Sequence, residues 1–350
     1  MFLVKKLKSI LLLGVGLFFG TVSFGQLDGI GAYLMGNWVN VAVDQERGKE
    51  GTATGAGFHF RGGAGTVPCG FVADPAFSGW AGTDWDGDFF TPGTPENGWG
   101  IEIAGVNYSN NYNVYEVIRD PAIPTTHTID GDCITVEWEG TVVGLRINVK
   151  YHLSMDDLFY TTEVTLINES GADLTDMYYY RNVDPDNNQP IGGTFTTTNT
   201  IVSQPEGDCQ KSLVSAEQAT PHDSYLGFGA LGPDFRVSTG GFSVRDGSDV
   251  WDATGGLTGT VGAVEVGDQA ISLAYKTDLA DTDTINFTYA VVLSEDAVED
   301  AFSSLYSVFY TSFGGIGGGV LNQCNPTTDT ADYCQGNDIT LTVDGPNADD

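Results

Sequence analysis

Short segments in which apolar and polar side chains alternate recur along most of the chain, and they constrain its fold more than any other feature. Period-two alternation turns one side of a strand toward a core and the other side toward water. Turns rich in Asp, Asn and Gly, such as 129–132 and 168–171, separate neighbouring segments at hairpin-like distances. The predicted strands are 38–43, 100–106, 112–118, 134–138, 145–153, 158–167, 177–183, 194–202, 235–238, 270–275 and 285–293.

This pattern predicts an all-β fold, a large antiparallel β-sandwich with two apposed sheets of super-sandwich size. No strand–helix–strand rhythm is present, which argues against a parallel sheet with a nucleotide site. One short covering helix is predicted near 294–308, because Ser294 can cap it and its apolar residues recur at helical spacing.

The N-terminal segment predicts export. Three lysines, Lys5, Lys6 and Lys8, precede the apolar run 10–19, and the small residues Ser23 and Gly25 follow it. This order is typical of a secretory signal peptide, here 1–25. A retained membrane anchor needs about 18 uninterrupted apolar residues, more than this run contains. We therefore expect a secreted, extracellular or cell-surface protein with no membrane insertion after signal cleavage.

The charge of the chain excludes some partners. The sequence contains 14 Lys and Arg against 47 Asp and Glu, a formal net charge of −33. Such a surface repels phosphate backbones and anionic lipid headgroups, which argues against nucleic acid and bilayer partners. The excess acids either attract divalent cations or only keep an exported protein soluble, and the sequence leaves both open.

The cysteines predict disulfides, since export places them where such bonds persist. Two bridges among four of the five cysteines allow three pairings, and a local Cys324–Cys334 bridge is the alternative. No Cys or His spacing indicates zinc. The four residues are Cys69, Cys133, Cys209 and Cys324.

Calcium is predicted to bind one or both of two acidic loops. Asp84, Asp86 and Asp88 occupy positions one, three and five of a Gly-containing loop, and calcium prefers six to eight oxygen ligands. The loop is not an EF-hand, because Phe89 occupies the sixth position, where that motif needs glycine. The alternative is an acidic turn between strands.

The second loop follows strand 177–183. Asp184, Asp186 and Asn187 place three oxygen-bearing side chains there, in a loop that Pro185 and Pro190 stiffen. These oxygens could hold a cation or a sugar, and ordinary Asx-turn chemistry is the alternative reading.

Aromatic and basic residues near these loops suggest a ligand surface. Trp80, Trp85 and Trp99 lie in a Gly- and Pro-rich stretch, and Arg181 directly precedes the second loop. No nucleophile elbow, zinc motif or phosphate loop is present. We therefore predict a non-catalytic binding or adhesion module for a glycan or surface protein, of unspecified oligomeric state. The alternative is a carbohydrate-active enzyme, a glycoside hydrolase or lyase, on the same scaffold.

The segment Cys334–Val343 resembles the opening of the immunoglobulin-like repeats of Bacteroidetes surface and gliding-associated proteins, in which a cysteine and a glycine precede an alternating strand. The signal ending 23–26 is also similar to signals of that group. The resemblance implies that 26–322 is a displayed module, 323–333 a linker and 334–350 the start of a repeat. The family's C-terminal sorting domain is not in this sequence.

Overall fold

The computed structural model of the chain describes residues 25–27, 31–51, 70–81, 84–86, 89, 96–110, 118, 125–206, 210–241 and 246–313. Several predictions from the sequence fall outside these ranges and stay predictions. They are most of the signal peptide, nearly all of strand 112–118, Asp88, Cys69, Cys209, Cys324, the linker 323–333 and the repeat 334–350.

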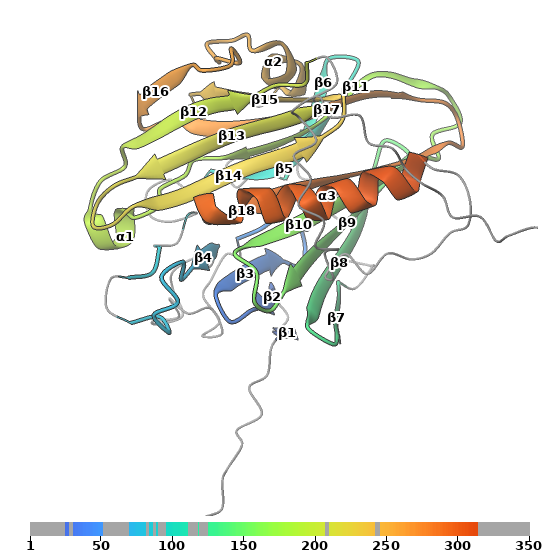
Figure 1. The fold of residues 1–350 in the computed structure, drawn as a ribbon. Coiled ribbons are helices and arrows are strands. Elements are labelled where there is room, and N and C mark those ends of the chain that lie inside the picture. Colours follow the sequence, from blue (N-terminus) through green and yellow to red (C-terminus); the bar gives the residue numbers. More distant parts are fainter. Residues whose placement is uncertain are drawn as a thin grey trace, which may run out of the picture.

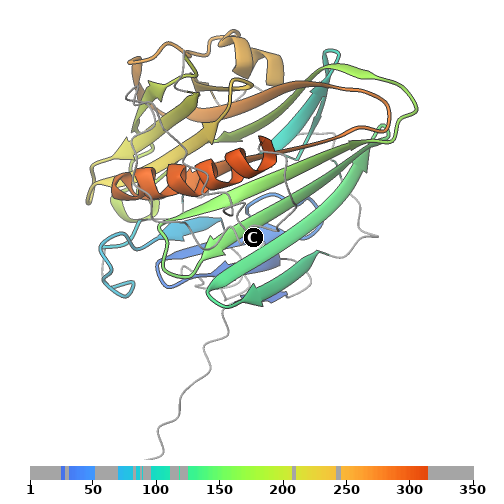
Figure 2. The same ribbon diagram turned by 45° about the vertical axis from the view of Figure 1, so that its right-hand side comes forward.

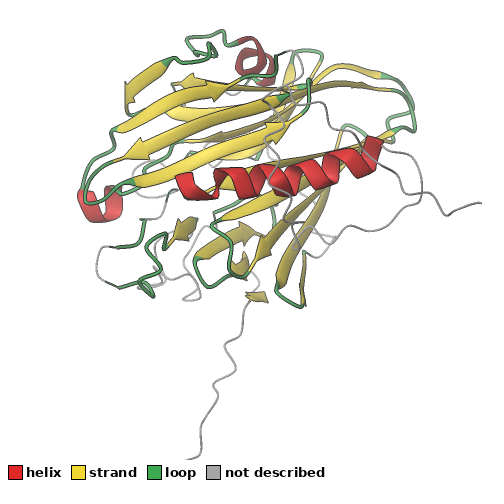
Figure 3. Ribbon diagram, in the orientation of Figure 1, coloured by secondary structure: helices red, strands yellow, loops and turns green. Residues whose placement is uncertain are grey.

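Antiparallel sheets make up the described fold, as Figures 1 and 3 show, so the prediction of a large antiparallel β-sandwich is confirmed. The largest sheet has nine strands, in the spatial order β16 (Val264–Gly267), β12 (Thr197–Ser203), β13 (Lys211–Gln218), β14 (Ser224–Leu231), β18 (Thr284–Val292), β10 (Phe159–Asn168), β9 (Leu145–Ser154), β8 (Cys133–Val142) and β7 (Thr126–Asp130).

Two smaller sheets pack against it. The five-stranded sheet has the order β15 (Phe235–Gly240), β17 (Ala270–Leu279), β11 (Leu174–Val183), β5 (Asn97–Ile103) and β6 (Val106–Ser109). It faces β12, β13 and β14, whereas the four-stranded sheet contacts β7 and β8 at the other end. The four-stranded sheet comprises β1 (Gly25–Leu27), β2 (Gly31–Met35), β3 (Val39–Asp44) and β4 (Phe71–Ala73).

Aromatic side chains fill the space between the large sheet and the five-stranded sheet. Tyr275 of β17 stacks on Phe287 of β18 with ring centroids 4.1 Å apart, and the Tyr179 and Tyr289 hydroxyls lie 3.0 Å apart. Along β9, buried and half-buried residues alternate strictly, as the sequence predicted. The aromatic rings between the nine-stranded and five-stranded sheets bury large apolar areas, so they join the two sheets into one core.

A helix covers the outer face of the nine-stranded sheet, as predicted near 294–308. The 3₁₀ turn η1 (Glu295–Ala297) leads into α3 (Val298–Phe313), which packs on β14, β18 and β10 (Figures 1 and 2). Gly229 of β14 permits this approach, because a Cβ there would lie 2.9 Å from Phe302 Cζ. Ser294 occupies the N-cap position but makes no side-chain capping bond.

Two shorter helices complete the described elements, α1 (Gln189–Gly192) and α2 (Gly247–Asp252). The latter packs on the outer face of the five-stranded sheet against β17, β15 and β11. In the described part of the chain, every helix is too short or too polar to cross a bilayer.

A tight hairpin after β3 carries charged residues into the core. Glu50 is fully buried and lies 3.2 Å from the guanidinium of Arg181, which is also fully buried. The Tyr160 hydroxyl donates to Glu50 at 2.8 Å, and the Tyr151 hydroxyl donates to the Gly48 carbonyl at 2.9 Å. A buried charge is tolerated when it is paired and hydrogen-bonded, and this network supplies both.

The neighbouring residues of this hairpin are buried as well. The Lys49 ammonium donates to the Asn97 carbonyl at 3.0 Å, and burial lowers the Lys49 pKa to about 7. Trp99 Nε1 donates to the Gly48 carbonyl at 2.7 Å. The hairpin is therefore bonded to β5 of the five-stranded sheet as well as to β9 and β10 of the large sheet.

Gly48 is expected to be indispensable. Its φ is +59°, and a Cβ would lie 2.2 Å from Trp138 Cδ2, so Gly48→Ala adds a clash to backbone strain. We expect a loss of about 3 kcal/mol in the free energy of unfolding, measured by urea denaturation. Gly131→Ala is the matched control, since Gly131 has a φ of +60° and open space around it, and it should cost about 1 kcal/mol. Equal losses for both variants would contradict the packing argument.

Breaking the buried ion pair is expected to be costly. Arg181→Met leaves the Glu50 carboxylate buried without its cation, so we expect a loss of about 3–5 kcal/mol by urea denaturation. The double variant Arg181→Met with Glu50→Met should be more stable than Arg181→Met alone, because it removes the stranded charge. A double variant that loses the sum of both single losses would contradict this account.

Candidate functional site

One candidate site begins at the loop after β4. The buried Asp74 carboxylate accepts from the backbone N–H groups of Ser78 at 3.1 Å and Trp80 at 2.8 Å, which closes the loop. The Asp86 N–H then donates to the Ala73 carbonyl at 2.8 Å. The loop is thereby held so that Asp86 faces the turn between β13 and β14.

Asp86 pairs with a histidine from that turn. Asp86 Oδ1 lies 2.7 Å from His222 Nε2, and the Asp86 side chain is fully buried whereas that of His222 is 26% exposed. Burial raises the Asp86 pKa to about 6, and the hydrogen bond to His222 works against that rise. The pair therefore holds one nitrogen of the imidazole ring against a carboxylate whose ionisation falls near neutral pH.

A cleft of about 610 Å³ opens beside this pair. Burial, with nearby acids, raises the pKa of Glu217 at its wall, and burial also raises that of Tyr225. His222 alone among its described lining residues can carry a positive charge. Most of the other lining residues carry a carboxyl, hydroxyl or amide group. These other residues are Pro75, Ala76, Asp84, Asp86, Thr198, Glu217, Gln218, Ala219, Asp223, Ser224, Tyr225, Leu293, Ser294, Glu295 and Asp296.

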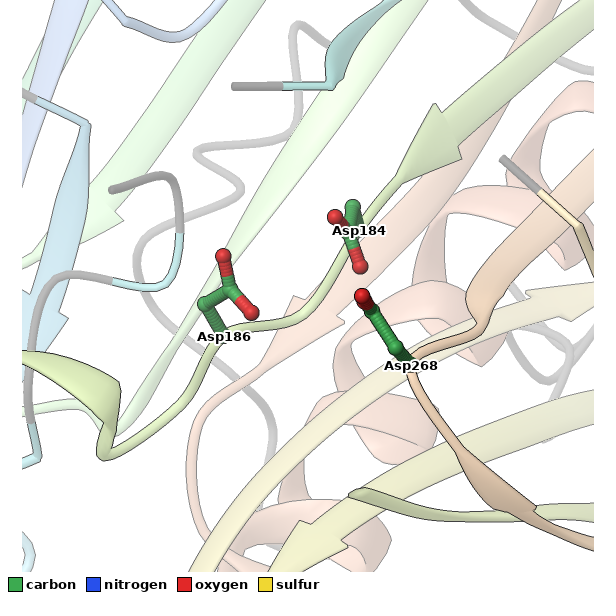
Figure 4. A group of neighbouring side chains, drawn as sticks. All are labelled: Asp184, Asp186 and Asp268. Carbon is green, nitrogen blue, oxygen red and sulfur yellow. The ribbon is translucent and has the colours of Figure 1, made fainter. Parts of the chain in front are cut away.

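A second cluster joins three carboxylates from two segments (Figure 4). Oxygens of Asp184, Asp186 and Asp268 all lie within 4.8 Å of one another. Strand β11 pairs antiparallel with β17, Val183 opposite Ile271, so residues just after β11 meet residues just before β17. The register therefore brings together acids that are far apart in sequence.

The electrostatics of this cluster are unfavourable for three ionised carboxylates. Burial first, and then the neighbouring acids, raise the pKa of Asp184 to about 7 and that of Asp186 to about 9. Within the described ranges, the ion pairs of Lys, Arg and His involve other acids. The two buried carboxyls of the cluster therefore resist ionisation, whereas Asp268 is exposed to solvent.

Hydrogen bonds connect the cluster to the cleft. The Asn187 amide donates to the Ala216 carbonyl at 3.0 Å, and the Asn188 amide donates to the His222 carbonyl at 2.8 Å. The Asn188 N–H also donates to the side chain of Gln218, which lines the cleft. The loop 184–188 is therefore bonded directly to β13 and to the β13–β14 turn.

The predicted calcium ligands are only partly brought together. Asp184 and Asp186 lie in the cluster, whereas the side-chain N–H₂ of Asn187 is bonded to a carbonyl. Asp84 is exposed at the cleft and Asp86 contacts His222, while Asp88 lies outside the described residues, so the first predicted loop remains a prediction. Sequence reasoning did not nominate Asp268, His222 or Tyr225.

The prediction of a ligand surface is wrong for two of its four residues. Trp99 and Arg181 are fully buried in the core, where they bond the β3 hairpin, so neither presents a surface to a ligand. Trp85 is also buried, with 8% of its surface exposed, and Trp80 is half-buried. Of the four predicted disulfide cysteines, Cys133 alone lies within the described residues, so the pairing stays a prediction.

The described fold is that of a β-sandwich protein with an acidic cleft. No protein-family model and no curated protein matches the chain. Among solved structures it is similar to the heparan sulfate lyase HepC from Pedobacter heparinus, with a TM-score of 0.37 and 10% identity over 77% of this chain and 36% of that chain.

Two further structures show similarity at the same level. The alpha-galactosidase AgaB from Geobacillus stearothermophilus has a TM-score of 0.36 and 9% identity over 81% of this chain and 42% of that chain. A YidC insertase has a TM-score of 0.33 and 8% identity over 86% of this chain and 47% of that chain. The matched part spans less than half of each of these chains. Overlap at this level assigns neither a family nor a function.

The acidic cluster predicts a pH effect on stability in the presence of EDTA. The unfolded chain loses the Asp186 proton near pH 4, whereas the folded chain keeps it up to about pH 9. Between these pH values the free energy of unfolding of the wild type therefore falls as pH rises, by at most about 1.4 kcal/mol per pH unit. A variant with an uncharged side chain at position 186 does not show this fall. Asp186→Asn should be close to wild type at pH 5 and more stable than wild type at pH 8 in urea denaturation. A variant less stable than wild type at both pH values would contradict this reading.

Proposed function

We propose that this chain is an exported, non-catalytic binding module that recognises a neutral glycan in the cleft beside Asp86 and His222. The observation that carries the proposal is the lining of that cleft, which is rich in hydrogen-bond acceptors and poor in cations. Sugar hydroxyls donate hydrogen bonds, and a carboxylate accepts them more strongly than a neutral oxygen does. An acidic glycan would meet charge repulsion from Glu217, Asp223 and Glu295.

The size and rigidity of the cleft support this proposal. Its volume of about 610 Å³ falls in the ordinary range of small-ligand sites. A Cβ on Gly227 would lie 2.9 Å from the Tyr225 ring, so the glycine leaves room for that ring against β14. Asn188 and Asp86 fix the turn that carries His222. A wall held in this way needs little ordering when a ligand binds.

The location belongs to the proposal as well. The signal-like segment 1–25 and the net charge of −33 both suit a protein that works outside the cell or on its surface, with a surface macromolecule as its partner. A glycan on a neighbouring surface or in the medium is the ligand class that the acceptor-rich cleft fits best.

A glycan array probed with the full mature chain tests the proposal. We expect binding to neutral glycans in preference to uronate-containing or sulfated ones, and a loss of affinity of about tenfold or more in Glu217→Gln. Asp130→Asn is the control, because Asp130 is an exposed acid in the β7–β8 hairpin outside the cleft lining. Preferential binding of sulfated glycans, or equal affinities for both variants, would overturn the proposal.

One observation favours a second candidate, a carbohydrate-active enzyme. The 2.7 Å contact orients His222 against a buried carboxylate, an arrangement that also serves a general base. The same screen should therefore measure new reducing ends and unsaturated products for each bound glycan. Turnover that is lost in His222→Gln would replace the binding module with an enzyme, whereas binding without product supports the binding module.

A further inference from the structure

The geometry of the Asp184, Asp186 and Asp268 oxygens fits one metal ion. Calcium binds oxygens at about 2.3–2.6 Å, so two ligands on opposite sides of one ion lie about 5 Å apart. The three carboxylate oxygens satisfy this limit, since they all lie within 4.8 Å of one another. Figure 4 shows the carboxylates pointing toward the space between them.

A second observation concerns the hydrogen bonding of Asp186. Its side chain is 3% exposed, and its Oδ1 atom is buried with no hydrogen-bond partner among the described residues. A buried carboxylate oxygen without a donor is costly, and most such groups in folded proteins are bonded. A bound cation would supply the partner that this oxygen lacks among the described residues.

The charges around the cluster also favour a bound cation. In the part of the chain that the structure describes, the ion pairs of basic side chains involve acids outside this cluster, such as Glu50 and Asp86. Asp184 is 7% exposed, so water screens its charge weakly, whereas Asp268 is exposed and leaves one side open to solvent. An ion could enter from that side and keep some of its water ligands.

We propose that Asp184, Asp186 and Asp268 bind one calcium ion. The donors are all carboxylate oxygens, without the His or Cys ligands that favour zinc. Three carboxylates can supply up to six oxygens in flexible geometry, which suits calcium, whereas magnesium demands a near-ideal octahedron with several waters. The ion joins the end of β11 to the connection between β16 and β17, and so it links the five-stranded sheet to the nine-stranded sheet.

The test uses the full mature chain, stripped with EDTA, dialysed and titrated with calcium chloride by calorimetry and thermal unfolding. We expect one ion per chain, a dissociation constant of about 0.1–1 mM as at other extracellular sites, and a midpoint of unfolding that rises with calcium. Asp268→Asn should weaken binding at least tenfold, and its exposed position leaves the core intact. Asp186→Asn should do the same.

Asp130→Asn is the matched control, because Asp130 is an exposed acid of the β7–β8 hairpin and belongs neither to the cluster nor to a predicted calcium loop, and its calcium affinity should equal that of the wild type. Three results would overturn the proposal. These are no saturable binding up to about 10 mM calcium, wild-type affinity in Asp268→Asn, or loss of binding in Asp130→Asn. Tighter binding of magnesium chloride than of calcium chloride would overturn the assignment to calcium. The readouts involve no glycan, so failure here is distinguishable from failure of the proposed glycan cleft.

Discussion

The ion pair between Glu50 and Arg181 is the interaction on which the rest of the structure depends. Both side chains are fully buried, so neither charge can be stabilised by water, and each needs the other. Glu50 arrives on the hairpin after β3, whereas Arg181 belongs to β11 of the five-stranded sheet. The pair therefore fixes the four-stranded sheet, through its hairpin, against the middle of the sandwich.

Both candidate sites are connected to this ion pair through β11 and the loop that follows it. Strand β11 ends two residues after Arg181, and its exit loop carries Asp184 and Asp186. The same loop reaches the β13–β14 turn through Asn188, and that turn presents His222 to Asp86. The cluster and the cleft are consequently two ends of one hydrogen-bonded segment. A disturbance of the core at Arg181 would displace both sites together.

Alternation predicted strands such as β9, in which buried and half-buried residues alternate, and apolar runs predicted the more fully buried β3, β5 and β11. The sequence nevertheless missed β13 and β14. Strand β14 is buried on both faces, between the five-stranded sheet and α3, so its Ser, Gly and aromatic residues show no period-two pattern. It was missed for that reason, and its neighbour β13, almost as fully buried, was missed with it.

The candidate sites were predictable only where their residues are close in sequence. Asp184 and Asp186 share one loop, so local spacing indicated them, but Asp268 joins them through the β11–β17 register. The partner of Asp86 lies 136 residues away, beyond the reach of any local motif. Trp99 and Arg181 were misassigned because residue type does not reveal burial, and the hairpin that buries them comes from a different sheet.

The connection that carries Asp268 passes from the nine-stranded sheet to the five-stranded one in two residues, Asp268 and Gln269. A calcium ion bound there would hold the two sheets together reversibly. The ion would be lost where free calcium is scarce and bound where it is abundant. The rigidity of this connection would then depend on the calcium concentration around the protein, since ion binding and folding are thermodynamically linked.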